Sequence, residues 1–569
     1  MYKNLNTYIG LLEREGELVR VAAQVSPVLE IAEITDRVSK SPGGGGVLLF
    51  ERVEGSVFPV VTNLFGSERR IALALGAGSL DEISGRLDGL LREAFAPRGS
   101  LAEKIKAVPL LAEASRWFPR QVSGRGECQQ VVLRGSEARL SALPVLKCWP
   151  HDGGRFVTLP LVHTVGPNGG AQNVGMYRMQ VYDDHTTGMH WHIHKTGARH
   201  YEAYRRAGVA RMPVSVCLGG DPAYTYAATA PMPDGMDEYL LAGFLRRRPV
   251  RLVRCVTNDL WVPADCDFVI EGWVDVNEPL RTEGPFGDHT GFYSLEDPYP
   301  VFHVSAITYR RDAIYPATLV GVPPQEDAWF AAATEKVFLP PIRSVLQPEI
   351  CDMHMPPAGC AHNLAIVSLD ISYAGQAEKV AAGLWGAGQM MFNKVLIATP
   401  ADFPIRDPEK VLELLRGIDP ERDLVFGHGV LDVLDHATAT PGVGGKLLID
   451  ATRPRGNAAG DNFKLIFDPA AEGMPPYECL WLGIANIDPV RDITIKDGIA
   501  TVDGRAKTSE GNGMPSRWPN VVVMDETTVV LVDRRWAEYG LGDFLPSPSD
   551  RYRKLLLSEV AQVSKKRSE

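Results

Sequence analysis

Between about residues 131 and 330, short runs of β-branched and aromatic residues recur between turn residues. Runs of this length and composition are typical of strands, and several in succession are typical of a β-barrel or a β-sandwich. The helical pattern from Met236 to Leu245 interrupts them. We therefore predict a barrel or sandwich with one or two helices for the centre of the chain. The runs are VVL, FVTLPLVHTV, MYRMQVY, MHWHIH, VSVCL, VRLVRCV, DFVIEGWVDV and VFHVSAITY.

The segment before this region alternates between helical and strand patterns. Apolar residues follow helical spacing from Leu5 to Leu18 and from Ser26 to Val38, and VLLF (47–50) has the pattern of a buried strand. A third helix is predicted from Ser79 to Phe95, with Ser79 as its N-cap. We therefore predict an α/β unit for this first part.

Strand and helix patterns alternate again after about residue 345. The predicted strands are NLAIVSLDI, KVLIATP and DLVFGHG, and the helices AGQAEKVAAGLWGAG and PEKVLELLRG separate them, which indicates a small α/β unit. After about residue 485 we expect two further strands, NVVVM and TTVVLV, and a closing amphipathic helix, DRYRKLLLSEVAQVSKK. A chain of 569 residues is too long for a single core. We divide it into residues 1–130, 131–335, 336–485 and 486–569.

Composition argues against several classes of protein. A net charge of −11 disfavours a nucleic-acid-binding protein, because such proteins need a basic surface. No window of about 18 apolar residues indicates a membrane span, and the charged, amphipathic N-terminus lacks the apolar core of a signal peptide. The eight cysteines contain no CxxC pair, so we expect reduced thiols in a cytoplasmic protein.

Histidines are concentrated between Asn173 and Tyr201, a stretch that holds five of the thirteen in the chain. Three of them alternate in HWHIH (190–194), and alternate side chains of a strand point to the same face. Imidazoles at this spacing can share a divalent metal ion. The alternative is that each histidine is buried with a partner or exposed to solvent. The five are His185, His190, His192, His194 and His200.

A magnesium or manganese site would usually include a hard oxygen ligand as well. Asn173, at the head of the histidine-rich stretch, and Glu238, in PDGMDEY, are the candidates. Sequence spacing alone does not bring Glu238 to His194.

Two carboxylates lie five residues apart in the glycine-rich sequence EGPFGDHTG (283–291). The glycines permit close backbone approach and the proline stiffens the turn, so Glu283 and Asp288 would project from a fixed loop as a proton-transfer pair. We expect their proximity to raise the pKa of one of them and make it a proton donor near neutral pH. Arg178 is a candidate third member, because a guanidinium holds a carboxylate in two-pronged geometry. The alternative is a pair of acids that caps a helix or forms a turn.

Six motifs resemble those of the UbiD family of reversible (de)carboxylases, which use prenylated FMN. They are NVGMYR, TGMHWHIHK, GGDPAYTYAATAP, EGPFGDHTGFY, AGQAEKV and GGKLLIDAT. The resemblance runs from the N-terminus to about residue 455. Within the family the chain looks most like the long bacterial members linked to menaquinone biosynthesis by the futalosine route.

This resemblance implies a mixed α+β and α/β fold of several domains. The expected parts are an N-terminal α/β domain, a central split β-barrel that binds the flavin, a C-terminal α/β oligomerisation domain and a C-terminal extension. A homo-oligomer, either a dimer or a hexamer, is expected. The residues after about 455 depart from the shorter members, and they would extend the oligomer interface or cover the active site.

The resemblance also implies a cofactor site. Asn173, His194 and Glu238 would hold a Mn²⁺ (or Mg²⁺) ion that grips the phosphate of prenylated FMN, and K⁺ commonly accompanies that ion. Of the three alternating histidines, only His194 would then bind the metal. A flavin prenyltransferase would supply the cofactor. The residues expected to line it are Met176, Tyr177, Arg178, His190, Trp191, His192, Lys195 and Thr196, with Lys394 near the phosphate.

Arg178, Glu283 and Asp288 occupy the positions of the family's catalytic trio. The implied reaction is the decarboxylation of an aromatic carboxylic acid, with the flavin as electron sink and release of CO₂. Asp288 would deliver the proton to the ring carbon, while Arg178 and Glu283 position the substrate. A dihydroxynaphthoate is the first expected substrate and a hydroxybenzoate the second, and the physiological direction stays open.

Two other functions are compatible with the residues alone. One is a flavin-free metal hydrolase in which HWHIH binds zinc and Asp288 acts as general base. The other is a non-catalytic assembly or storage protein that keeps the flavin fold, although the presence of Arg178, Glu283 and Asp288 together argues against it.

Overall fold

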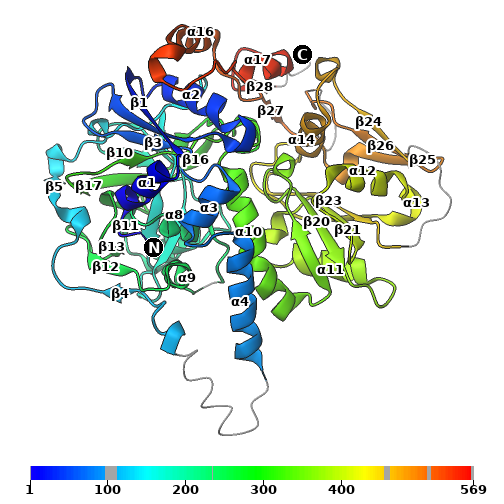
Figure 1. The fold of residues 1–569 in the computed structure, drawn as a ribbon, viewed down its shortest axis with the longest axis horizontal. Helices are drawn as coiled ribbons and strands as arrows, with labels where there is room; N and C mark the ends of the chain where they lie inside the picture. The colour runs from blue at the N-terminus through cyan, green and yellow to red at the C-terminus, as the bar shows by residue number, and fades with distance from the viewer. Residues whose placement is uncertain (1, 97–111, 234, 454–461, 509–513, 565–569) are drawn as a thin grey trace.

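The computed structural model describes residues 2–96, 112–233, 235–453, 462–508 and 514–564. Three units follow one another along the chain, and a C-terminal segment (residues 462–508 and 514–564) returns from the third unit to the first (Figure 1). Within the described residues, no helix is both long and apolar enough to cross a lipid bilayer. All eight cysteines are free thiols, as the sequence predicts.

The first unit is a four-stranded sheet with the order β1-β2-β3-β18, so a strand from residues 315–316 completes its edge. Helix α4 begins after Ser79, whose side chain accepts a hydrogen bond from the Glu82 amide (3.2 Å), which confirms the predicted N-cap. The first helix ends earlier than predicted, because the chain turns at Gly16 (φ 74°) into β1. The elements are α1 (Leu5–Arg14), β1 (Leu18–Val25), α2 (Glu30–Ser39), β2 (Val47–Val53), β3 (Val60–Thr62), α3 (Glu68–Ala74), α4 (Leu80–Phe95) and β18 (Tyr315–Pro316).

A nine-stranded sheet with the order β6-β9-β10-β17-β14-β11-β7-β8 forms the central unit, and β5 pairs with β17. It is the split barrel that the sequence predicts. The strands are β5 (Val131–Arg134), β6 (Arg155–Val157), β7 (Leu161–Thr164), β8 (Asn173–Met176), β9 (Met179–Val181), β10 (Thr186–Gly188), β11 (Arg211–Leu218), β14 (Phe268–Asp275) and β17 (Val301–Tyr309). Around them lie α7 (Thr196–Ala207), α8 (Pro222–Thr229), α9 (Glu238–Arg246) and the small pairings of β4 (Arg120–Gln121), β12 (Arg251–Arg254), β13 (Trp261–Pro263), β15 (Arg281–Glu283) and β16 (Asp297–Tyr299).

The third unit is a five-stranded sheet with the order β19-β20-β21-β23-β22. Its three inner strands are parallel and its two edge strands antiparallel, in agreement with the predicted alternation of strands and helices. The elements are β19 (Ile350–His354), β20 (Leu364–Leu369), α11 (Gln376–Trp385), β21 (Val395–Pro400), α12 (Pro408–Arg416), α13 (Pro420–Asp423), β22 (Leu424–Val430) and β23 (Val443–Asp450).

Two of the predicted unit boundaries fall inside structural elements. Helix α10 (Asp327–Pro341) spans the boundary at 335 and packs against α3 and α4 of the first unit. Strand β24 (Phe463–Ile466) pairs with β26 (Ile499–Asp503), so the boundary at 485 divides a sheet. The C-terminal segment is therefore continuous with the third unit at its beginning.

The C-terminal segment differs from its predicted secondary structure. TTVVLV, predicted as a strand, lies in helix α16 (Glu526–Arg535), because Asp525 caps the helix and the buried Val529 and Val532 pack into the core shared with the first unit. The predicted closing helix is replaced by short turns and a strand. The elements are β24, α14 (Pro476–Asn486), α15 (Pro489–Asp492), β25 (Ile493–Lys496), β26, β27 (Arg517–Pro519), α16, α17 (Ser549–Tyr552) and β28 (Gln562–Ser564).

Candidate active site

Arg178, Glu283 and Asp288 form a buried ionic cluster in the central unit. The Arg178 guanidinium binds both oxygens of Glu283, with Nε–Oε1 and Nη2–Oε2 distances of 2.8 and 3.0 Å, and its Nη1 contacts Asp288 Oδ2. Nη2 also donates to Ser294 Oγ (2.9 Å), and the Phe286 ring packs on the guanidinium. The three charged side chains are 8%, 0% and 9% exposed, so solvent screens their interaction little.

The strands around this cluster explain how distant residues meet. Arg178 lies in the two-residue link between β8 and β9, and Glu283 is the last residue of β15. Asp288 follows in a loop (residues 283–294, hereafter the catalytic loop) that closes through a backbone hydrogen bond from Asp288 to Phe292 (3.0 Å). The buried Asp152 accepts the Gly287 amide of this loop (2.7 Å) and fixes it from the other side.

Both carboxylates of the cluster have lowered pKa values. Burial by itself raises the pKa of Asp288, but Arg178 and then His289 outweigh it and lower the pKa to about 2. Burial likewise opposes the effect of Arg178 and His190 on Glu283, whose pKa ends well below its usual range. The expectation that proximity raises one of the two pKa values is therefore wrong, because the guanidinium between the carboxylates dominates their mutual repulsion.

HWHIH is a loop and not a strand. Strand β10 ends at Gly188, which pairs with Val301, the first residue of β17. Residues after Gly188 therefore have no residue of β17 to pair with. His190 and His192 nevertheless meet, with their Nε2 atoms 2.6 Å apart, and His190 Nδ1 lies 3.0 Å from Glu283 Oε2. The histidines therefore do not line one face of a strand. Two of them extend the ionic cluster instead.

His289 is a member of the cluster that the sequence analysis did not single out. Its Nδ1 lies 3.1 Å from Asp288 Oδ1. Burial lowers its pKa, but Asp288 and, more weakly, Asp327 and Asp432 raise it to about 9. In the sequence, only its position directly after Asp288 indicated that His289 could belong to the site. His289 is therefore an imidazolium at neutral pH, in contact with the candidate proton donor.

The third unit contributes to the same region. Asp432, which follows β22, lies 3.6 Å from His362 Nε2, and the rings of His362 and His289 are 6.3 Å apart. The Phe392 ring lies between the rings of His194 (4.6 Å) and His362 (5.5 Å). No motif pointed to these residues, because they belong to a different sheet and reach the cluster only through the packing of the two units.

Asn173 and Glu238 lie side by side where β8 meets the start of α9. Glu238 Oε2 accepts the Val174 amide (2.8 Å), and the Asn173 amide nitrogen, in its hydrogen-bonding orientation, lies 3.2 Å from Glu238 Oε1. Burial raises the pKa of Glu238 to about 7, so a cation at this carboxylate would hold it ionised. His194 Nε2 is buried without a hydrogen-bond partner. These donors fit a hard divalent ion.

The structure does not bring the three expected ligands into one contact. Among the described residues, no three His, Cys, Asp or Glu side chains are close enough to enclose a metal ion. Asn173 and Glu238 form the nearer pair, whereas the His194 ring packs against Phe392 (4.6 Å) and lies 5.9 Å from the His192 ring. The side chains of Asn173 and Glu238 are therefore adjacent, and His194 lies in a separate loop.

The other predicted flavin-lining residues surround this pair. Tyr177 is buried with its ring against Gly175, where a Cβ would lie 2.4 Å away, and Trp191 covers Gly197 in the same manner (2.6 Å). The Nε1 of Trp191 is buried without a partner. The remaining three occupy the end of β8 and the beginning of α7. They are Met176, Lys195, whose ammonium lies 5.5 Å from the Phe392 ring, and Thr196.

Lys394 lies apart from these residues. Its ammonium contacts Asp435 Oδ2 (2.5 Å) and the carbonyls of Ile484 (2.9 Å) and Ile487 (3.0 Å), and its side chain is fully buried. An ammonium has three N–H donors, and these three acceptors use them. We therefore leave Lys394 out of the proposed phosphate site.

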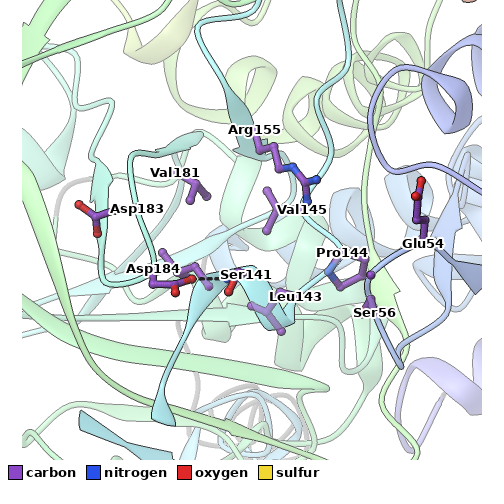
Figure 2. Close-up of a pocket in the computed structure, with 12 residues that line it drawn as sticks. Glu54, Ser56, Ser141, Leu143, Pro144, Val145, Arg155, Val181, Asp183 and Asp184 are labelled. Carbon is purple, nitrogen blue, oxygen red and sulfur yellow. Dashed lines mark hydrogen bonds between the residues drawn. The ribbon is translucent and has the colours of Figure 1, made fainter. Parts of the chain in front are cut away.

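A cavity of about 330 Å³ lies elsewhere, between the first and central units. Figure 2 shows Arg155, Val145 and Val181 beside it. Because successive side chains of a strand point to opposite faces, Arg155 of β6 faces this cavity while Phe156 lies 5.9 Å from the Arg178 guanidinium. None of the residues lining this cavity belongs to the ionic cluster, so we do not place the active site there.

Family profiles match three successive parts of the chain. They are described as the N-terminal domain (residues 9–87), the Rift-related domain (residues 120–323) and the C-terminal domain (residues 328–451) of 3-octaprenyl-4-hydroxybenzoate carboxy-lyase, UbiD. The chain belongs to the UbiD family. An uncharacterized protein of Archaeoglobus fulgidus is 44% identical to this UbiD-family chain over 489 residues, which are 85% of this chain and 99% of that protein.

Solved structures of UbiD-class enzymes have the same fold. The closed form of vanillic acid decarboxylase from Sedimentibacter hydroxybenzoicus is 25% identical, with a TM-score of 0.69 over 82% of this chain and 96% of that one. HmfF from Pelotomaculum thermopropionicum in complex with FMN is 27% identical, with a TM-score of 0.66 over 83% and 99%. An evolved dimeric form of HmfF was solved with prenylated FMN (26%, TM-score 0.65, 84% and 99%). The prediction of a carboxy-lyase is confirmed at the level of the family.

Proposed function

We propose that this protein is a prenylated-FMN-dependent enzyme that reversibly and non-oxidatively decarboxylates an aromatic carboxylic acid. The observation that carries the proposal is the buried cluster in which Arg178 bridges Glu283 and Asp288. Such a cluster places a carboxylate that can carry a proton next to a cation that can bind the substrate carboxylate. The UbiD-class relatives of known structure, which bind FMN or prenylated FMN, support the cofactor.

In this proposal the residues of the chain bind, orient and move a proton. The chemistry supplied by a bound prenylated FMN is an electron sink for the ring carbon that loses CO₂. Arg178 orients the substrate carboxylate, and Glu283 fixes the guanidinium in its two-pronged arrangement. Asp288 Oδ2 then protonates the ring carbon. In the reverse direction the same oxygen accepts the proton.

A carboxylate with a pKa of about 2 needs a source for its proton, and His289 is the group in contact with it. We propose that the imidazolium of His289 passes its proton to Asp288 in concert with proton delivery from Asp288 to the ring carbon, because a pKa of about 9 against about 2 disfavours transfer to the resting carboxylate. His289 then takes up a proton from solvent. The groups that face His289 are Asp288, Asp327, Asp432 and His362. As the pH rises through about 9, His289 loses its charge, and reprotonation of Asp288 should slow.

Replacing His289 with asparagine tests this relay. We expect kcat to fall about tenfold at pH 7, with a smaller effect on KM, because a hydrogen-bond donor to Asp288 remains while the mobile proton is lost. The wild-type enzyme should lose kcat above pH 9, and this limb should be absent from the pH profile of the variant. An unchanged profile would exclude His289 as the proton source.

The proposed metal is Mn²⁺ or Mg²⁺, held by the oxygens of Asn173 and Glu238 with His194 as third ligand. We expect Glu238→Ala to lower the Mn²⁺ affinity and the flavin content at least tenfold, because it removes the charged ligand. Asp237→Asn is the matched control. Asp237 only caps the same helix through the Tyr239 amide (2.8 Å), so this variant should keep its metal. Metal analysis and flavin absorbance after dialysis distinguish the two results.

The proposed substrate class is a hydroxylated aromatic acid. We place a dihydroxynaphthoate first, because the motifs look most like those of long bacterial members linked to menaquinone biosynthesis, and a hydroxybenzoate second. Structural relatives that act on vanillic acid and on 3,4-dihydroxybenzoic acid are consistent with this class, although the latter share the fold alone.

We also propose a flavin prenyltransferase as cofactor supplier, a homo-oligomer as the active assembly, and K⁺ beside the divalent ion.

The deciding experiment is production of the protein together with a flavin prenyltransferase. The absorbance spectrum, the mass of the released cofactor and the metal content should give prenylated FMN and about one Mn²⁺ per chain. Screening aromatic acids for CO₂ release then identifies the substrate. A colourless protein that contains only zinc would favour the hydrolase instead, although His190 and His192 here bind Glu283 and each other.

A further inference from the structure

The catalytic loop is covered on its outer side by the C-terminal segment. The Val522 amide donates to the Gly291 carbonyl (2.9 Å), and the Tyr293 amide donates to the Asn520 carbonyl (3.0 Å). Between them Phe292 and Val521 form an antiparallel bridge. The loop that carries Asp288 is therefore paired, over several residues, with a strand-like stretch more than 200 positions further along the chain.

Trp481, on helix α14, holds the same loop from a second direction. Its Nε1 donates to the Thr290 carbonyl (2.8 Å), two residues after Asp288. Its ring lies directly on Gly291, where a Cβ would be 2.5 Å from the indole, and Gly291 has a φ of 84°, a conformation that favours glycine. Glycine is therefore required at position 291 for two reasons: the turn needs a positive φ, and any side chain would collide with the Trp481 ring.

Asn520 fixes the paired stretch in turn. It is fully buried, its Nδ2 donates to the Ser558 carbonyl (2.8 Å), and its Oδ1 accepts the Leu557 amide (2.8 Å). The backbone N–H of Asn520 donates to the Ala561 carbonyl (2.8 Å). The end of the described chain therefore serves as the support on which the loop-binding stretch rests.

The segment is anchored at its other end in the first unit, where α16 lies above α2 (Figure 1). Arg37 Nη1, from α2, lies 2.7 Å from Asp533 Oδ1 and donates to the Leu545 carbonyl (2.9 Å). Tyr539 donates its hydroxyl to Glu30 Oε1 (2.6 Å). Because both ends are held by buried polar contacts, the stretch between them has little freedom to leave the catalytic loop.

We propose that the C-terminal segment is a brace that sets the position of Asp288, with Trp481 and Asn520 as positioning residues. The inference rests on the proposed function, because it assigns importance to the place of the proton donor. A displacement of a catalytic group by about 1 Å can cost about 10²-fold in rate. The brace acts on the backbone of the loop, through residues 290–293.

Trp481→Phe tests the proposal, and Trp536→Phe is its matched control. Both tryptophans are buried in the C-terminal part of the chain, and each donates one indole hydrogen bond to a carbonyl, Trp481 to Thr290 and Trp536 to Asp543 (3.0 Å). Only the first bond ends on the catalytic loop. We expect similar decreases in Tm for the two variants. Hydrogen exchange of amides 287–294 should rise about tenfold in Trp481→Phe and stay unchanged in Trp536→Phe.

The kinetic constants should distinguish the two variants in the same way. In Trp481→Phe we expect kcat to fall about tenfold with KM changed less than about twofold, while Trp536→Phe stays near the wild type. Equal exchange in both variants, or equal loss of kcat, would overturn the proposal. Since exchange is measured without substrate, a wild-type protein that releases no CO₂ would refute the proposed function and leave this comparison valid. If Trp481→Phe fails to fold, Ser558→Ala, which removes an Asn520 contact (3.1 Å), should raise the same exchange about twofold, and unchanged exchange would refute the brace.

Discussion

Asp288→Asn is expected to abolish decarboxylation while the flavin stays bound. The amide has nearly the same shape as the carboxyl group and can still accept a hydrogen bond, but it has no acidic proton to give to the ring carbon. General acids of this kind contribute about 10²–10⁴-fold to the rate, so kcat should fall by at least about 10²-fold. CO₂ release in a single turnover and the flavin spectrum of the same sample measure the two properties.

A suitable control is Asp221→Asn. Asp221 also pairs with a buried arginine, Arg246, at 2.7 Å, but it lies at the start of α8, outside the catalytic loop and outside the C-terminal segment. This variant makes the same chemical change and should keep a kcat close to that of the wild type. Normal turnover by Asp288→Asn would mean that another group delivers the proton.

Arg178→Met should have the largest effect on stability. Arg178 is the guanidinium between Glu283 and Asp288, so its loss leaves two buried carboxylates without a cation. Removing one partner of a buried ion pair costs about 3–5 kcal/mol. We therefore expect a strongly lowered Tm together with loss of CO₂ release. Arg178→Lys keeps the positive charge but lacks the planar guanidinium, so its Tm should lie between those of the wild type and Arg178→Met.

The pH dependence of this loss has a definite sign. Glu283 and Asp288 have lowered pKa values in the folded protein, so their contribution to stability is present above about pH 4 and is lost as the pH falls toward 2. In Arg178→Met, burial without the guanidinium favours the protonated acids. The difference in Tm between wild type and variant should therefore be largest near pH 7 and shrink below about pH 4. A constant difference would show that Arg178 acts through packing alone.

A second change should restore part of the lost stability. Glu283→Gln in the Arg178→Met background removes one of the uncompensated charges, and the double variant should have a higher Tm at pH 7 than Arg178→Met alone. It should stay inactive, because neither the substrate-binding cation nor its support is present. If the decreases in Tm of the two single variants simply added in the double variant, the ionic interpretation of the cluster would be wrong.

The proximity of Glu283 and Asp288 and the order of the units could be predicted because local sequence carries them. EGPFGDHTG contains its own turn residues, and the α/β units show their periodicity directly. HWHIH was misjudged because a strand needs a neighbour, and the partner strand β17, which begins at Val301, decides this from more than 100 positions away. The helix at TTVVLV was missed because its β-branched residues favour strands locally, and only packing on the first unit overrides that preference.

Two of the missed members of the site lie on another unit. Asp432 and His362 reach His289 through the contact between two sheets, and no spacing in the sequence encodes that contact. The expectation that one of Glu283 and Asp288 has a raised pKa failed because it rested on the repulsion between two acids in one loop. Arg178, which reverses the sign, comes from a distant segment between β8 and β9.

The bond between Arg37 and Asp533 spans 496 positions, and this distance affects synthesis of the protein on the ribosome. At roughly 5–20 residues per second, the first helices wait roughly half a minute to a minute and a half for their last partners to be made. During this time α2 exposes an apolar face that the finished protein buries beneath α16. Transiently exposed apolar surface of this kind favours aggregation, so we expect the nascent chain to need chaperones. A message truncated near its 3′ end would yield a chain whose first unit is never covered.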